Sequence, residues 1–281
     1  MSIGIFFSDI RPYLSEGAHR YDAAFARLRE NGITGLQFRD AEILEEGEEP
    51  LLAAMGRHGL HTDVIHICIP LMSADHAIFD TAVQYAHYTL PLLTRFGCRR
   101  LMIVPRPKSD VVSREDRSRA QDAIIQGLRR ILDATPDSVE ILVENYSFSQ
   151  IPFSTARDIE VLLSSLPRLG FILDTGNFHC VGESPHHAYS RFKDRISAVH
   201  VKNCSLTEDV SKGVPVDGNK RMITLPFSHN VMELESLLRT AARDGMDPPL
   251  VMEHNPHTPW EEIIDNSELL QQIFSKKGEA I

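Results

Sequence analysis

The sequence has little cysteine, a single tryptophan and no excess of basic residues. Its four cysteines form no CxxC pair, which argues against a disulfide framework and predicts reduced thiols in a cytoplasmic protein. No apolar stretch has the length of a membrane span, and no basic segment followed by an apolar run opens the chain, so we expect no membrane partner. The formal net charge of −10 argues against a nucleic-acid partner, because phosphate binding requires clustered Lys and Arg.

The chain also lacks a linker, a low-complexity tract and a fixed-period repeat. Its 281 residues, 42% of them hydrophobic, predict one globular domain over 1–281. Short apolar runs alternate with segments of helical period. Several runs are apolar on successive residues, as expected for parallel strands that are covered on both faces. The eight predicted strands are 3–7, 35–38, 62–66, 100–104, 139–144, 170–174, 197–201 and 249–253.

The segments between these runs have helical periodicity. Tyr21, Ala24, Phe25 and Leu28 follow the i, i+3, i+4, i+7 spacing of one apolar helix face. Eight strands that alternate with helices predict a single (β/α)8 TIM barrel of the α/β class. An open doubly wound sheet would need a Gly-rich nucleotide-binding turn after an early strand, and the sequence has none.

An ionisable residue lies at or next to the end of each of the last four predicted strands. These residues are Glu144, Asp174, His200 and Glu253. The active site of a (β/α) barrel lies at the C-terminal ends of its strands, where a charge on a buried strand needs a partner. Each of the four alone would more often be an N-cap, a salt-bridge partner or a hydrogen-bonded core residue. Together at one barrel mouth they predict a divalent metal site, because a hard cation neutralises carboxylates that otherwise repel one another.

The strand ends and their flanking residues resemble the xylose isomerase-like barrels. This superfamily of sugar-phosphate isomerases and epimerases includes D-tagatose 3-epimerase-type enzymes, hydroxypyruvate isomerase and inosose dehydratase. The resemblance covers nearly the whole chain and rests on the segments 142–145, 173–178, 198–203 and 251–254.

This resemblance implies one metal ion, with Glu144, Asp174, His200 and Glu253 as its ligands. Mn²⁺ is the first expectation, and Mg²⁺, Co²⁺ and Zn²⁺ are alternatives. The ion would chelate a carbonyl and a neighbouring hydroxyl, and an enediolate would form on proton loss. Glu144 and Glu253 would be the catalytic acid and base on opposite faces of the substrate. The implied function is a divalent-metal-dependent isomerase or epimerase of a sugar or keto-sugar.

Alternative functions stay open at this point. A lyase or dehydratase acting on a keto-sugar or inosose would share the first step. The chain departs from the ketose 3-epimerase pattern, since Asn177 and Gln150 replace a His and a Glu, and 205–209 lacks the usual Arg. A DNA-repair endonuclease resembling endonuclease IV shares the barrel but needs a three-zinc cluster. Here Asn177 replaces a needed His, and the fourth strand ends in Pro105 and Arg106.

Six further residues are candidate contacts for a small carbohydrate substrate. His66 ends the third predicted strand and could reach a substrate oxygen, and Lys202 could neutralise an anionic group. Phe7 could form an apolar wall, and Trp260 could line the mouth, although a packed cap over the last helix is equally consistent. The sequence is compatible with a homo-oligomer and does not specify the oligomeric state. The six candidates are His66, Lys202, His179, Asn177, Trp260 and Phe7.

Overall fold

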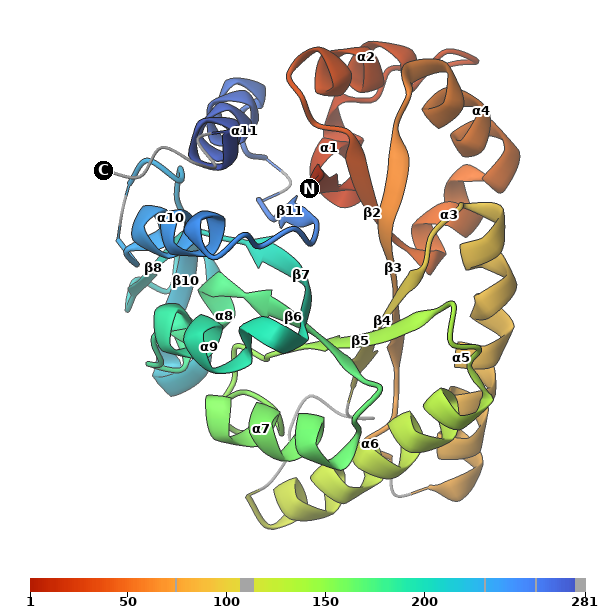
Figure 1. Cartoon of the computed structure of the whole chain (residues 1–281), viewed down its shortest axis with the longest axis vertical. Helices are drawn as coiled ribbons and strands as arrows, with labels where there is room; N and C mark the ends of the chain where they lie inside the picture. Colours follow the sequence, from red (N-terminus) through yellow and green to blue (C-terminus); the bar gives the residue numbers. More distant parts are fainter. Residues whose placement is uncertain (74, 107–113, 230, 256, 276–281) are drawn as a thin grey trace.

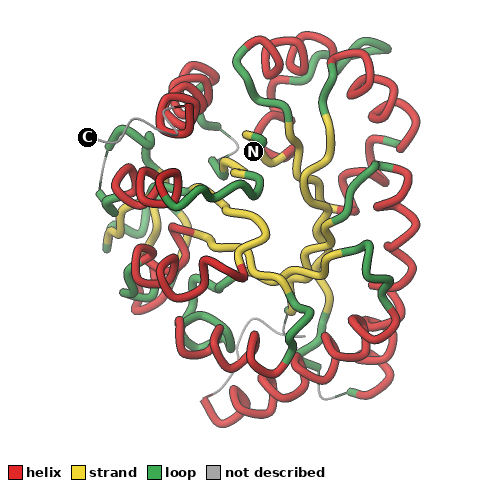
Figure 2. Tube along the Cα trace, in the orientation of Figure 1, coloured by secondary structure: helices red, strands yellow, loops and turns green. Residues whose placement is uncertain are grey.

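A closed barrel of eight parallel strands forms the centre of the protein (Figures 1 and 2). The computed structural model describes all residues except 74, 107–113, 230, 256 and 276–281. Each strand pairs with its neighbours along the chain, and the last strand, β11, closes the ring against β1. The predicted (β/α)8 barrel is therefore confirmed. The barrel strands are β1 (Ile3–Phe6), β2 (Gly35–Arg39), β3 (His61–Ile69), β4 (Arg100–Pro105), β5 (Glu140–Glu144), β6 (Gly170–Asp174), β7 (Ile196–Val201) and β11 (Leu250–Met252).

Helices surround the barrel on the outside, as the red segments around the yellow strands show in Figure 2. The predicted apolar stripe at Ala24, Phe25 and Leu28 is the buried face of α2. No helix in the described part of the chain combines the length and apolar composition needed to cross a bilayer. The helices are α1 (Phe7–Ile10), α2 (Asp22–Glu30), α3 (Asp40–Glu46), α4 (Glu48–His58), α5 (His76–Arg95), α6 (Arg114–Ala134), α7 (Ala156–Ser165), α8 (Thr175–Cys180), α9 (Pro185–Phe192), α10 (Leu234–Arg243) and α11 (Trp260–Ser275), with short 3-10 turns at Arg11–Tyr13, Lys193–Arg195 and Asp217–Asn219.

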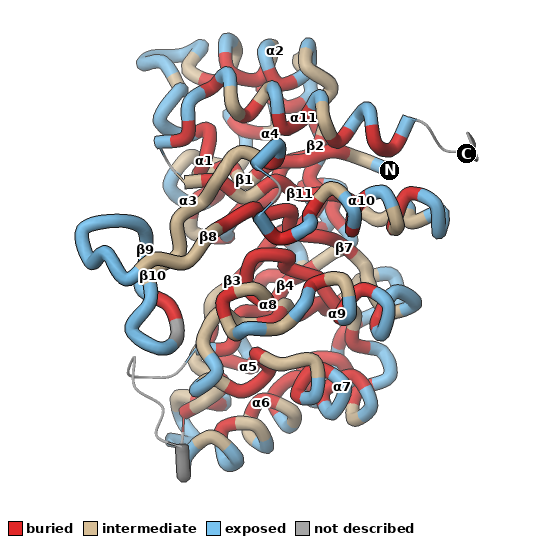
Figure 3. The backbone as a smooth tube through the Cα atoms, turned by 90° about the vertical axis from the view of Figure 1, so that its left-hand side faces the viewer, coloured by how far each residue is buried: buried red, intermediate tan, exposed pale blue. Residues whose placement is uncertain are grey.

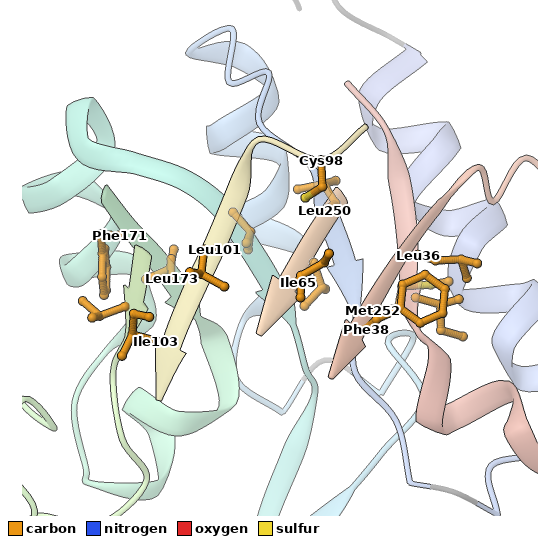
Figure 4. Close-up of a cluster of buried hydrophobic side chains, with 14 of the residues drawn as sticks. Leu36, Phe38, Ile65, Cys98, Leu101, Ile103, Phe171, Leu173, Leu250 and Met252 are labelled. Carbon is orange, nitrogen blue, oxygen red and sulfur yellow. The ribbon is translucent and has the colours of Figure 1, made fainter. Parts of the chain in front are cut away.

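Successive strand residues point to opposite faces of the barrel wall, which divides the apolar residues into two layers. The outward layer packs under the helices, and Figure 4 shows members such as Leu36, Ile65 and Leu173. In the tube coloured by burial, the barrel strands are mostly red and the outer helix surfaces are pale blue (Figure 3). The inward layer is smaller and forms the floor beneath the strand ends. Its buried members are Val64, Met102, Val104, Leu142, Ile172 and Ala198.

A second, three-stranded antiparallel sheet follows β7, and the sequence analysis did not predict it. Its strands are β8 (Cys204–Thr207), β9 (Val214–Pro215) and β10 (Arg221–Thr224), in the order β8-β10-β9. Figure 3 shows β9 and β10 projecting from the barrel. The strands are short and largely exposed or half-buried, so they carry no strong apolar pattern.

Candidate metal centre

Three of the four predicted ligands meet at the C-terminal mouth of the barrel. Glu144 and Asp174 are the last residues of β5 and β6, and His200 lies one residue before the end of β7. Pairing in register places Asp174 beside His200. One ligand atom from each side chain lies within 4.8 Å of the other two. Asp174 and His200 are fully buried, whereas Glu144 is partly exposed.

The chemistry of this cluster fits a divalent cation. His200 Nδ1 lies 2.9 Å from Glu144 Oε2. Burial disfavours charge on His200, but the hydrogen bond to Glu144 and the charges of Glu144, Glu253 and Asp174 together outweigh burial and raise the pKa of His200 above its usual value. The cluster thus favours a positive charge between these atoms. Two carboxylates and one imidazole are donors that suit Mn²⁺, Mg²⁺, Co²⁺ or Zn²⁺.

Glu253, the fourth predicted ligand, lies at the same mouth but is paired with Lys202. The Lys202 Nζ atom is 2.8 Å from Glu253 Oε1 and 3.0 Å from Asp174 Oδ2. Burial opposes the charge on Lys202, but the surrounding carboxylates raise the pKa of Lys202 well above its usual value. Burial raises the pKa of Glu253 to about 7, although Lys202 acts in the opposite direction. A buried ammonium therefore bridges two of the four predicted ligands.

Hydrogen bonds between neighbouring side chains and the backbone hold Asp174 and Lys202 in place. The Thr175 hydroxyl donates to the Lys202 carbonyl at 2.7 Å and accepts from the Lys202 amide at 2.9 Å. A Cβ atom at Gly176 would lie 2.6 Å from Lys202 Cδ, so only glycine leaves room for the lysine chain. Asn145 accepts from the Asp174 amide at 3.0 Å and donates to the Asp174 carbonyl at 3.2 Å. These bonds fix the strand ends that carry the charged side chains.

A cavity of about 490 Å³ opens above the cluster. Both glutamates, Glu144 and Glu253, line it together with Lys202 and Asn177. Volumes of roughly 300–1,000 Å³ are usual for small-molecule sites. Polar residues in its wall that were not predicted as site residues from the sequence include Arg106 after β4, and Tyr146 and Ser147 after β5. Burial, reinforced by the Glu144 charge, keeps the pKa of Tyr146 well above its usual value, so its hydroxyl stays protonated.

The structure places the predicted substrate contacts at different depths. Asn177 and Lys202 line the cavity. His66 does not end its strand, because β3 continues to Ile69. Its side chain is buried within the barrel beside Gln37, and burial lowers the pKa of His66 to about 3. His179 lies on α8 and is not among the residues that line the cavity.

Phe7 and Trp260 lie in the packed part of the molecule, away from the cavity. β1 ends at Phe6, and the alternation of the strand directs Phe6 inward, where its ring centroid is 4.9 Å from that of His200. Phe7 is fully buried and packs against Phe38 in the outward layer. Trp260 is buried at the start of α11, where its ring packs against Tyr13. It therefore packs at the beginning of the last helix and does not line the cavity. The inward-facing aromatic residue at this strand end is thus Phe6 and not Phe7, and neither is among the residues that line the cavity.

The sequence pattern of the xylose isomerase-like TIM barrel family matches residues 25–273. The chain belongs to this family. No curated protein sequence matches it. In the part of the chain that the structure describes, one group of three side chains is placed so that it could hold a metal ion, whereas the endonuclease alternative requires a three-zinc cluster.

Solved structures share the xylose isomerase-like barrel over nearly their whole length. The probable 3-DHS dehydratase AsbF from Bacillus anthracis has a TM-score of 0.73 at 16% identity, covering 97% of this chain and 98% of that one. The IOLI protein with a bound zinc atom has a TM-score of 0.73 at 13% identity and covers 100% of both chains. D-Psicose 3-epimerase from Clostridium cellulolyticum H10 with D-tagatose has a TM-score of 0.67 at 13% identity, covering 98% of each chain. At these identities the similarity establishes the shared fold.

Proposed function

We propose that the protein is a divalent-metal-dependent isomerase or epimerase of a sugar or keto-sugar. The observation that carries this proposal is the cluster of Glu144, Asp174 and His200 beneath a cavity that also exposes Glu253. When bound there, a divalent ion would act as a Lewis acid that polarises the substrate carbonyl. Mn²⁺ is our first choice, with Mg²⁺, Co²⁺ and Zn²⁺ as alternatives, because carboxylates and one imidazole suit all four.

The two glutamates would move the protons. Glu253 lies on the Lys202 side of the site and Glu144 on the His200 side. A pKa of about 7 for Glu253 allows it to accept or release a proton near neutral pH, which is the range where general acid–base catalysis is most effective. One carboxylate would remove the proton beside the carbonyl, giving an enediolate. The other would return a proton to the opposite face.

The remaining residues of the cavity would bind and orient the substrate. The Asn177 side chain donates to the Asn145 carbonyl at 2.9 Å, which fixes its amide at the edge of the cavity. Arg106, Tyr146 and Asn177 supply polar groups that suit the hydroxyls of a small carbohydrate. Lys202 would stabilise negative charge that develops on a substrate oxygen.

A lyase or dehydratase is the second candidate function. It shares removal of the proton beside the carbonyl, after which a group on the next carbon leaves. The observation that favours it is Lys202, an ammonium at the cavity wall that contacts both Asp174 and Glu253. A departing hydroxyl could take a proton from this ammonium.

Hydrogen exchange tests the proposed function. The Mn²⁺-loaded protein is incubated in D₂O with a panel of ketoses, 3-keto-glycosides and inososes, and the products are followed by NMR. We expect deuterium to enter the carbon beside the carbonyl of the substrate, because the removed proton equilibrates with solvent. Deuterium entry without loss of a group identifies an isomerase or epimerase, and a new double bond identifies a lyase.

Metal removal provides the control for this experiment. Protein stripped with EDTA should show no exchange, and Mn²⁺ should restore it. Turnover of a substrate without exchange or elimination would contradict proton abstraction as the first step. Full exchange after complete chelation would show that the ion is not part of the chemistry.

A further inference from the structure

Gln37 lies inside the barrel, below the cavity, and contacts two histidines. It is a β2 residue with 0% exposure. Its Oε1 atom lies 2.9 Å from His200 Nε2, and its Nε2 atom lies 3.3 Å from His66 Nδ1. Among the described residues, its side-chain hydrogen-bond partners are the two imidazoles and the Met102 sulfur. A buried amide of this kind restricts its neighbours to particular proton positions.

Met102 supports the orientation of the Gln37 amide. The Gln37 Nε2 atom lies 3.8 Å from Met102 Sδ. A thioether sulfur accepts hydrogen bonds and cannot donate one, so the amide NH₂ faces Met102 and the carbonyl oxygen faces His200. The same orientation directs an N–H at His66 Nδ1, which accepts it as a neutral imidazole.

We infer that Gln37 is a positioning residue that selects the metal-binding tautomer of His200. The Gln37 carbonyl oxygen can only accept, so His200 Nε2 carries a hydrogen. Nδ1 faces the Glu144 carboxylate at 2.9 Å and donates its hydrogen to it, so this is the proton that leaves when the ring becomes neutral to bind an ion, and the lone pair then lies on Nδ1. Nδ1 is therefore the atom offered to an ion in the cluster of Glu144, Asp174 and His200. This inference rests on the metal-dependent function proposed above.

The orientation of the ring follows from the same contact. Nε2 and Nδ1 are held on two sides, by Gln37 from β2 and by Glu144 from β5, so the imidazole plane cannot rotate freely. Groups that hold the outer nitrogen of a ligating histidine raise its basicity and typically contribute about 10- to 100-fold to metal affinity. Gln37 fills this role from the opposite side of the barrel.

Metal affinity and the His200 tautomer test the inference. Gln37→Met keeps the approximate volume but removes the acceptor, and we expect its Mn²⁺ affinity, measured by isothermal titration calorimetry, to fall about 10- to 100-fold. Gln37→Glu retains an acceptor for the His200 N–H and should bind Mn²⁺ within about threefold of the unmodified protein. Leu142→Met, a volume-conserving change in the same interior layer, is the matched control.

Proton positions are measured separately on Zn²⁺-loaded protein labelled with ¹⁵N-histidine. Long-range ¹H–¹⁵N spectra should show a hydrogen on His200 Nε2 and the ion on Nδ1. Ion coordination at Nε2, or Mn²⁺ affinity of a folded Gln37→Met protein within about twofold of the unmodified protein, would overturn the inference alone. If Gln37→Met does not fold, the inference is tested by the His200 tautomer in the unmodified protein and by the Mn²⁺ affinity of Gln37→Glu. Absence of Mn²⁺ binding by the unmodified protein would overturn the proposed function as well.

Discussion

Replacing Glu253 by glutamine should lower kcat by about 10²- to 10⁴-fold, the usual contribution of a general acid or base. The amide has nearly the same shape, but it can neither take nor release the proton. Metal binding should weaken by a much smaller factor, because Glu253 is only one of four expected ligands and Glu144, Asp174 and His200 form the cluster without it. A large loss of kcat together with a small change in Mn²⁺ affinity would identify Glu253 as a proton-transfer residue.

Steady-state kinetics and calorimetry on the purified variant provide this comparison. Glu140→Gln is the matched control, because Glu140 lies at the opposite end of the barrel, where β5 begins, and pairs with Arg100 at 3.1 Å. It should keep the unmodified kcat. Equal losses of kcat and Mn²⁺ affinity in Glu253→Gln would instead make Glu253 a metal ligand without a separate role in proton transfer.

Replacing Lys202 by methionine should destabilise the metal-free protein by about 3–5 kcal/mol, because it leaves the fully buried Asp174 carboxylate without its partner. The Lys202 side chain is 5% exposed, and its ammonium contacts both Asp174 and Glu253. The same change should tighten Mn²⁺ binding by at least about tenfold, since about 1.4 kcal/mol of removed repulsion suffices for that factor. Mn²⁺ should therefore stabilise the variant more than it stabilises the unmodified protein.

Chemical denaturation with EDTA and with Mn²⁺ measures both effects. Lys193→Met is the matched control, because Lys193 makes an exposed ion pair with Asp244 at 3.0 Å, and such pairs contribute roughly 0–1 kcal/mol. Weaker Mn²⁺ binding in Lys202→Met would show that the ammonium organises the ligands and does not compete with the ion for them.

The barrel and the main cluster could be predicted from the sequence because both depend on strand ends. Buried parallel strands produce continuous apolar runs, and an ionisable residue such as Glu144 or Asp174 interrupts such a run visibly. The C-terminal location of barrel active sites then brings these residues together. The prediction did not require any knowledge of side-chain contacts.

Other parts of the site depend on which face of a strand a residue occupies. Phe7 was one residue from the inward position that Phe6 occupies, because an apolar run has no visible alternation from which to assign its faces. Gln37 lies within a strand and not at its end, so the strand-end argument did not include it. Its polar side chain among apolar neighbours was the available signal, since a buried amide requires hydrogen-bond partners.

Long-range pairing explains the remaining difference. The bond from Lys202 to Glu253 joins the ends of β7 and β11, which are neighbours only after the barrel has closed. The sequence suggested that Lys202 would face an anionic group, but it could not show that this group belongs to the protein. The carboxylates that face Lys202 belong to the chain itself, and they come together only in the folded barrel.

A crystal structure of the protein with saturating Mn²⁺ tests the central claim most directly, with the ion located by its anomalous scattering. We expect one ion at the barrel mouth, with Glu144, Asp174 and His200 Nδ1 at about 2.0–2.4 Å, and Glu253 released from Lys202 as a fourth ligand. Such a structure would establish the metal centre on which the proposed proton chemistry depends. No ion among these atoms, or an ion bound only elsewhere on the chain, would contradict the account.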